Sequence, residues 1–583
     1  RRQRQMCIRD RRDATNLFLG SGTENTPDVV LEGGMFQNEG GNGSDYHIYS
    51  LISRGNSAIY MPNNGWNTWN RNTFGIRDNG VMRVESGHLA IWSNNHDSNN
   101  AITFENKSGG NGPTVEEGAT VYSEYPIHPT KANSNRTLLM DGGGTWVQTK
   151  RLFCNAIVSG GYSPGAVYLR NGFTLRWNLG EDSHITSTSD CITTFHIQSG
   201  SRMDGAGRLQ RSDLVVKEGG TLSSGLPQDW ETIDRAHKWY SSVPDRFKGE
   251  PSDSIRKLRI YGNVTFEDGA ILEANLANAK ALDVDGTVTF GQALTVRLTN
   301  LPAMLTEARQ LTDFANAPTG SPKISCPEAI ALGSEVVLRD GNLWLEPGAG
   351  GYVWADQTGD WTDGRWTTNA VANLEIPYKS DASDEEAPVA RIVGSGANAS
   401  VRVTKPDLPT VTEGTFWGNH ALVLSAEAGR TVTLGQGTTD EEKPNGLTVA
   451  TSLWKIGAGE AKANVPLRFA NFGNSSTLNV NAGTLTVALP FSKESLDTAY
   501  PARNTLPAGF AAEIGEGAEL RFAFDGLATE EALGFSPLTQ TIAGKVTGDG
   551  TLAFAPTAAN AKLTLTGTAD SNLDYDCLLY TSD

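Results

Sequence analysis

The side chains best suited to acid and base chemistry lie in residues 223–256, an irregular stretch that interrupts a pattern of short strands. Five of them carry carboxylates or basic groups: Asp229, Glu231, Asp234, Lys238 and Arg246. An acidic cluster that holds Ca²⁺ beside a base is the arrangement of a polysaccharide lyase. The same residues also fit the solvated surface of a short helix capped by Asp229. We therefore assign no catalytic residue and keep a lyase or glycosidase as the alternative function.

Six aromatic side chains are candidates for stacking on sugar rings: Trp66, Trp69, Trp92, Trp230, Trp239 and Tyr240. The first three lie among Asn-rich turns, and the other three lie in residues 223–256. In a repeat fold, Asn and aromatic residues also stack on one another and satisfy backbone groups at the corners. We predict these six as the ligand-binding residues, with the structural role left open.

Motifs for nucleophilic, metal or cofactor chemistry are incomplete. Residues 161–165 read Gly-Tyr-Ser-Pro-Gly, but Pro164 has no N–H to complete an oxyanion hole. The sequence contains no CxxC pair and no HxxxH pair. We therefore expect no metal site and no cofactor. Cys154 and Cys191 are compatible both with a disulfide and with two buried free thiols.

The composition favours short strands and tight turns and excludes two classes of partner. The chain has 583 residues, including 64 Gly, and a formal charge of −18. Nucleic-acid binding needs clustered Lys and Arg, so we expect no nucleic-acid partner. No apolar run reaches the ~20 residues that span a bilayer, so we expect no membrane insertion. The acidic runs at 384–386 and 440–442 are typical of solvated loop tips.

Two segments, 258–266 and 282–290, align at a spacing of 24 residues around a shared Gly. Apolar residues alternate on both sides of that Gly, which places every second side chain on one face of a strand. A period in the twenties is typical of one coil of a parallel solenoid. The spacing therefore predicts parallel strands, with Ile260 beside Val284.

A shorter motif, a Gly followed by Leu and a further apolar residue, recurs along the whole chain. Examples begin at Gly87, Gly172, Gly341, Gly483 and Gly550. Each predicts a turn that leads into a half-buried strand. Arrays of β-sandwiches also have such strands, and the 24-residue spacing favours coils instead.

Residues 477–487, 546–554 and 563–567 resemble the autotransporter-associated β-strand repeat of large bacterial passenger proteins. The resemblance implies an all-β chain folded as a right-handed parallel β-helix, exported to the cell surface ahead of a C-terminal barrel. No strand series for such a barrel is evident in this sequence. Truncation and another anchoring route both fit that observation.

The chain divides into two expected β-solenoid blocks and two atypical ends. The first block covers 13–346, including the insertion at 223–256, and the second covers 352–576. A Pro-Gly-rich break near 346–353 separates them, and Trp354, Trp361 and Trp366 follow it. Residues 1–12 and 577–583 resemble translated sequencing-adapter sequence and are interpreted as non-native ends. A basic targeting tail and a natural C-terminus are the alternatives.

These observations predict a bacterial passenger, secreted or held at the cell surface, that acts as an adhesin or structural stalk. Its partners would be glycans or host surface proteins. The expected location is extracellular or at the cell surface, associated with the outer membrane in the complete protein.

Overall fold

The structure is a computed structural model. It describes residues 5–9, 28–37, 46–60, 73–76, 80–92, 101–104, 110–123, 127–129, 137–148, 165–178, 193–210, 212–225, 257–277, 282–302, 305–348, 351–368, 372–374, 389–403, 416–436, 446–465, 467–469, 476–489, 491, 505–506, 508–524, 539–556, 561–567 and 574–577.

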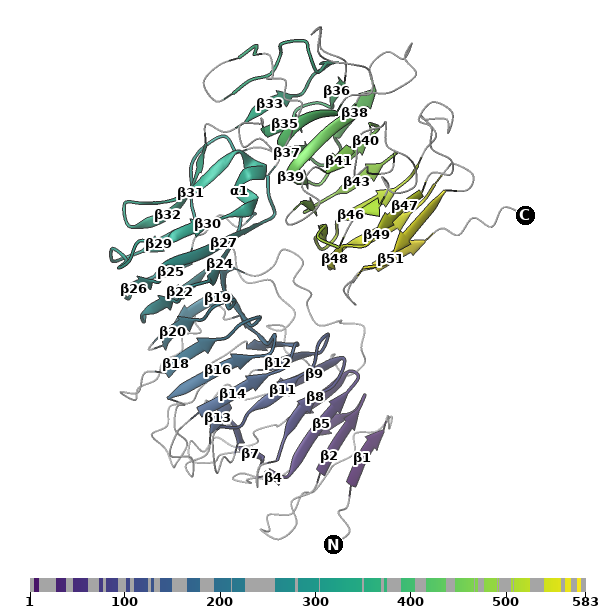
Figure 1. The fold of residues 1–583 in the computed structure, drawn as a ribbon. Helices are drawn as coiled ribbons and strands as arrows, with labels where there is room; N and C mark the ends of the chain where they lie inside the picture. The colour runs from purple at the N-terminus through teal and green to yellow at the C-terminus, as the bar shows by residue number, and fades with distance from the viewer. Residues whose placement is uncertain are drawn as a thin grey trace, which may run out of the picture. The chain divides into compact units, whose positions relative to one another are not determined.

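The described residues form long parallel β-sheets, in which each strand pairs with the strand of the next coil (Figure 1). This arrangement confirms the all-β class and the parallel β-helix expected from the sequence. Two units are distinguished by their internal contacts, and the first consists of 1–297, 310–325 and 336–344. The second consists of 298–309, 326–335 and 345–583.

Two sheets extend through most of the first unit. Sheet 1 contains β1 (Gln5–Arg9), β2 (Asp28–Glu32), β5 (Ser50–Arg54), β8 (Met82–Val84), β11 (Pro113–Val115), β14 (Thr137–Asp141), β16 (Ala166–Arg170), β18 (Thr193–Ile197), β20 (Ser212–Val216), β23 (Val264–Phe266) and β26 (Val288–Phe290). Sheet 2 contains β3 (Met35–Gln37), β6 (Ser57–Tyr60), β9 (His88–Trp92), β12 (Thr120–Ser123), β15 (Thr145–Gln148), β17 (Thr174–Asn178), β19 (Arg202–Leu209), β21 (Thr221–Ser224), β24 (Ala270–Asn275), β27 (Ala293–Thr299) and β30 (Lys323–Ser325).

Shorter sheets form the third side of the coils. Early in the chain this side contains β4 (Tyr46–Ile48), β7 (Thr73–Ile76), β10 (Ala101–Phe104) and β13 (Ile127–Pro129). Later it is sheet 3, which contains β22 (Leu258–Ile260), β25 (Leu282–Val284) and β29 (Thr312–Phe314) and joins sheet 2 through β19. Further along the chain lie the helix α1 (Pro327–Leu332) and a small sheet of β28 (Arg309–Gln310), β32 (Asn342–Pro347) and β31 (Ser334–Arg339).

The second unit repeats this plan. Sheet 4 contains β33 (Tyr352–Ala355), β35 (Val389–Gly394), β37 (Phe416–Ala426), β39 (Gly446–Ile456), β42 (Thr477–Val480), β45 (Ala511–Ile514) and β48 (Lys545–Gly548), and β41 (Leu467–Phe469) also pairs with β39. Sheet 5 contains β34 (Thr358–Asp360), β36 (Ala399–Val403), β38 (Thr431–Gln436), β40 (Glu460–Ala463), β43 (Thr484–Val487), β46 (Glu519–Phe522), β49 (Thr551–Phe554) and β51 (Asp574–Cys577). Sheet 6 contains β44 (Thr505–Leu506), β47 (Thr539–Ile542) and β50 (Lys562–Leu565).

The 24-residue spacing appears directly as register. Ile260 lies beside Val284, and Phe266 lies beside Phe290, in parallel pairs. The stack continues through Phe314, with ring centroids 5.5 Å apart in the first pair and 6.2 Å apart in the second. The prediction of parallel strands at Ile260 and Val284 is therefore confirmed.

Coil length varies although the register is kept. Thr193 pairs with Ser212, so that coil advances by 19 residues, whereas Leu214 pairs with Val264 and advances by 50. The long coil contains residues 223–256. Inward and outward side chains alternate along each strand, so pairing requires that inward residues of successive coils lie side by side. It does not constrain the length of the loops between the strands.

The five motif glycines each precede a strand of the structure, as predicted: β9, β17, β32, β43 and β49. Gly483 has φ of 66°, which favours Gly, and a Cβ there would lie 2.2 Å from the carbonyl oxygen of Gly459. At this corner the Gly both makes the turn and lets the preceding coil approach.

Strands also occur at both ends of the chain that we interpret as non-native. Gln5 pairs with Asp28 at the start, and Phe554 pairs with Cys577 at the end. This pairing does not test where the end sequences come from, so their interpretation stays a prediction.

Candidate functional site

A row of charged residues lies on the outer face of sheet 3. In β22 the flanking Leu258 and Ile260 are buried, so the central Arg259 points outward. Register places Arg259 beside Asp283 of β25, and Asp283 beside Asp313 of β29. The alternation of a β-strand therefore aligns three charged side chains from three successive coils.

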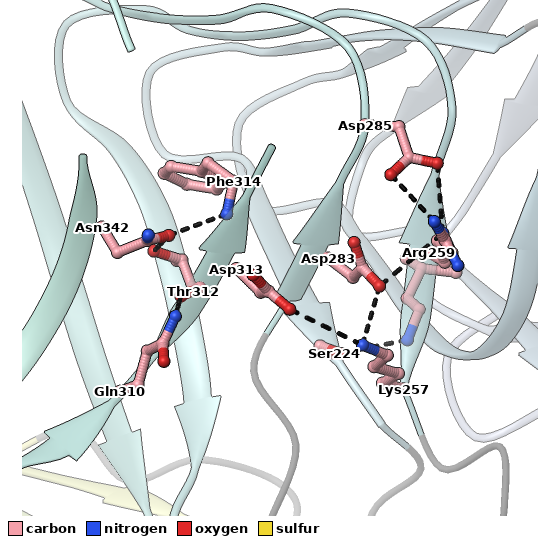
Figure 2. A network of polar contacts seen from close by, with 11 residues as sticks. Ser224, Lys257, Arg259, Asp283, Asp285, Gln310, Thr312, Asp313, Phe314 and Asn342 are labelled. Carbon is pink, nitrogen blue, oxygen red and sulfur yellow. Dashed lines mark hydrogen bonds and ion pairs between the residues drawn. The ribbon is translucent and has the colours of Figure 1, made fainter. Parts of the chain in front are cut away.

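Lys257 and Arg259 provide the positive charges of this row (Figure 2). Lys257 Nζ lies 2.7 Å from Oδ2 of Asp283 and 3.9 Å from Oδ2 of Asp313. Because like charges on adjacent strands repel, Lys257 compensates the placement of two aspartates side by side. It therefore links β25 to β29.

Arg259 links the row to the turn that follows β25. Its Nε and Nη2 donate to the two carboxylate oxygens of Asp285 at 3.1 and 3.0 Å, and Nε lies 3.7 Å from Asp283. The hydrogen bonds to Asp285 raise the pKa of Arg259. The guanidinium also lies over the ring of Tyr261, 5.0 Å from its centroid.

Asn342 holds β29, the last strand of this sheet. Its Oδ1 accepts a hydrogen bond from the backbone N–H of Phe314 at 2.7 Å (Figure 2). The backbone N–H of the next residue, Leu343, donates to Oγ1 of Thr312 at 2.8 Å. Gln310 donates from Nε2 to the carbonyl of Thr312 at 2.6 Å. These contacts use polar groups of an edge strand and keep Asp313 in position.

Three side chains of the row are accessible to solvent. The Asp313 side chain is 61% exposed, while Lys257 and Arg259 are 30% and 40% exposed. Carboxylates accept hydrogen bonds and the two cations donate them, so adjacent groups suit adjacent hydroxyls of a sugar. Each carboxylate of the row also lies within 4.0 Å of a cation, which stabilises the stacking of three coils.

A second charged cluster lies on the outer face of sheet 2. The fully buried Asp204 accepts hydrogen bonds from Arg176 at 2.8 and 3.0 Å and from Arg202 at 2.7 Å. Arg202 continues to Glu273, with Nη1 2.8 Å from Oε2. Burial raises the pKa of Asp204, but the two guanidinium groups outweigh it and lower the pKa below its ordinary value. This carboxylate stays charged and joins β17 to β19, and Arg202 extends the link to β24 through Glu273.

The residues predicted to carry the chemistry lie outside the described residues. This applies to Trp66, Trp69, Trp230, Trp239 and Tyr240, to the acidic and basic candidates between Asp229 and Arg246, and to Cys154 and Cys191. The backbone of Trp92 lies in β9, but its side chain is not described. All these assignments stay predictions.

Sequence reasoning missed the charged row of sheet 3. A signal was present, because Arg259 and Asp283 occupy the same position of the two segments that align at 24 residues, with opposite charges. A repeat comparison that tracks outward positions would have identified it.

Within the described ranges, no group of three His, Cys, Asp or Glu side chains could hold a metal ion. Among the same residues, Cys326 is a free thiol, and burial raises its pKa to about 12. No helix in the described part of the chain is long and apolar enough to cross a membrane.

Comparison with known proteins yields no relative. No family model matches the sequence, and no curated protein and no solved structure matches it either.

Proposed function

We propose that this protein is a bacterial passenger, secreted or held at the cell surface, that acts as an adhesin or structural stalk of the autotransporter type. The observation that supports this proposal is the in-register parallel stacking of coils within each unit. Each coil buries its inward residues against its neighbours, so the stack gains stability from every added coil.

The outer faces of such a stack suit binding over a long surface. Outward side chains of successive coils repeat at about 4.8 Å, so Arg259 and Asp313 present charged groups on one face, with the buried Asp283 between them. Glycans and host surface proteins carry repeated hydroxyl and charged groups that match this spacing. These are the partners that we propose, at an extracellular or cell-surface location.

A polysaccharide lyase or glycosidase is the second candidate. It is favoured by the mixture of carboxylates with Lys257 and Arg259 on one outer face, since such enzymes combine acidic and basic groups. Here both cations are engaged with carboxylates, which fits binding better than proton transfer.

A glycan array combined with an assay for unsaturated uronates and new reducing ends separates the two functions. We expect saturable binding without product, and weaker binding by at least fivefold in a Lys257→Ala, Asp313→Ala double variant, because two hydrogen-bonding groups are lost (about 1 kcal/mol). Arg365→Ala, an exposed substitution in the second unit, is the matched control.

Product formation that Lys238→Ala or Arg246→Ala abolishes would establish the enzyme and refute the adhesin. If the protein binds neither a glycan on the array nor a host surface protein, that result would also count against the adhesin function. Protease treatment of intact cells that express the complete gene tests the location, with loss of the protein from the surface expected.

A further inference from the structure

Arg391 is an outward residue of β35 that is nevertheless buried. Its neighbours Ala390 and Ile392 point into the core with 0% exposure, so the alternation of the strand turns Arg391 to the outer face of sheet 4. Only 4% of Arg391 is exposed. A guanidinium on an outer face would normally extend into water.

The strands beside Arg391 supply apolar side chains. Register places Val353 of β33 on one side and Val423 of β37 on the other, and Trp454 of β39 follows in the same row. Val353, Val423 and Trp454 are 9%, 0% and 4% exposed. None of these three side chains carries a carboxylate.

The Nε and Nη2 atoms of Arg391 are buried and have no hydrogen-bond partner among the described residues. Burying an N–H without an acceptor destabilises a fold, and a buried charge without a counter-charge costs several kcal/mol more. Burial lowers the pKa of Arg391 to about 10, which still leaves the guanidinium charged at neutral pH. Among the described residues, Arg391 is therefore a cation without a counter-charge.

Other arginines of this chain show what the same atoms bind. Arg176 and Arg259 each use Nε and Nη2 to hold both oxygens of one aspartate, and Arg521 holds Glu519 in the same way at 2.7 and 2.9 Å. This edge of the guanidinium matches two oxygens of an oxyanion. In Arg391 that edge is buried and has no hydrogen-bond partner among the described residues.

We propose that Arg391 forms a binding site for an oxyanion, whose two oxygens accept hydrogen bonds from Nε and Nη2. The chemistry fits a carboxylate, a sulfate or a phosphate group. Such a group comes either from a free inorganic ion or from an acidic glycan that carries uronate or sulfate. The site does not depend on the adhesin function, because it follows from the burial and the free edge of Arg391 alone.

Thermal unfolding of the complete chain tests the site, with sodium sulfate compared with sodium chloride at matched ionic strength. Bound sulfate stabilises only the folded state, so we expect it to raise the wild-type Tm by about 2–4 °C. Arg391→Met removes the unpaired charge and keeps an apolar stem. We expect this variant to be at least as stable as wild type in chloride and to show less response to sulfate.

Arg402→Met is the matched control, because Arg402 lies on the neighbouring β36, is 46% exposed and pairs with Asp360 at 2.6 Å. It should respond to sulfate as wild type does. An equal sulfate response in wild type and Arg391→Met would overturn the proposal. The proposal would also be overturned if Arg391→Met were less stable than wild type in sodium chloride.

Two further arms identify the source of the anion. Titrations with oligogalacturonate and with its methyl ester test for an acidic glycan, because only the unesterified form has free carboxylates. If the source is an inorganic ion, sulfate raises the Tm and neither glycan does. Neutralising Asp384, Glu385 and Glu386 to Asn, Gln and Gln tests the chain's own acidic run. If this lowers the Tm of wild type but not that of Arg391→Met, the counter-charge is internal and the proposal is wrong.

Discussion

Lys455 shows at the scale of one residue how this fold accommodates a cation in its interior. It occupies an inward position of β39, between Leu424 and Val480 of the adjacent strands, and is fully buried. Its Nζ donates to the carbonyl oxygens of Ile456, Gly457 and Ala482 at 3.0, 2.6 and 2.9 Å. The amine thereby satisfies carbonyls at a corner of the coil.

Burial lowers the pKa of Lys455 from 10.5 to about 7. The unfolded chain therefore binds more protons between pH 7 and 10.5, and the free energy of unfolding should rise with pH across that range. We expect this rise to be smaller in Lys455→Met. Chemical denaturation at several pH values measures it, and equal slopes in both proteins would refute the prediction.

Asp356, which follows β33, stabilises the corresponding turn of the next coil in the second unit. Its carboxylate accepts hydrogen bonds from the backbone N–H groups of Ser395, Gly396 and Ala397 at 2.6, 3.0 and 3.0 Å. Burial raises the pKa of Asp356, but these hydrogen bonds, with that from the Ser395 hydroxyl, outweigh it and lower the pKa to about 2. Its stabilising effect is thus complete above pH 3.8 and is lost as the pH falls towards 2.

We expect Asp356→Ala to lower the free energy of unfolding of the second unit by about 1.5–3 kcal/mol at pH 7. Between pH 4 and pH 2, the free energy of unfolding should also decrease less in the variant than in the wild type. Denaturant titration at both pH values measures the effect. Asp549→Ala, at an exposed position, is the control that should leave the curve unchanged.

At the scale of elements, three tryptophans pack together beside the first strands of the second unit. Trp366 is fully buried, with ring centroids 5.5 Å from Trp354 and 4.8 Å from Trp361. Trp366 Nε1 donates to the carbonyl of Trp361 at 2.9 Å, and Thr367 pairs with Val353 at the edge of sheet 4. The cluster is part of the hydrophobic core of the second unit, together with Ala390 and Ile392 of the next coil.

Trp366→Ala should therefore lower the free energy of unfolding of the second unit by about 3–5 kcal/mol, since it removes a large buried ring. Trp344→Ala, at a half-buried position in β32 of the first unit, is the comparison and should lower the free energy of unfolding of that unit less. Calorimetry of the complete chain measures both. Equal losses would show that the buried tryptophan cluster contributes no more to stability than a half-buried ring.

The corner glycines of the coils provide a matched pair. Gly483 and Gly517 have nearly the same φ, 66° and 67°, but a Cβ at Gly517 would meet nothing within 4 Å. Gly517→Ala thus measures the backbone strain alone, about 1–2 kcal/mol. Gly483→Ala adds the collision with Gly459 and should be clearly more destabilising in thermal unfolding. Similar losses would mean that the coils separate readily at this corner.

At the scale of the whole molecule, the parallel β-helix was predictable and the candidate site was not. The alternation and glycine spacing of 258–266 and 282–290 led to the observed pairing of Ile260 with Val284. The spacing did not predict coils of 19 or 50 residues, because the ladder constrains matched faces and not the loops between them. The charged row of sheet 3 could be recognised only after the structure had shown which outward residues of successive coils lie side by side.

The sequence by itself determined the class of fold, because strand alternation and glycine turns are local properties of the chain. Only the tertiary structure decided that Arg391 and Lys455 are buried, and which of them has partners. Arg391 stands in the apolar run Val-Ala-Arg-Ile-Val, and nothing in that run distinguishes an exposed cation from a buried one. Their burial depends on side chains of adjacent coils that lie more than 20 residues away along the chain.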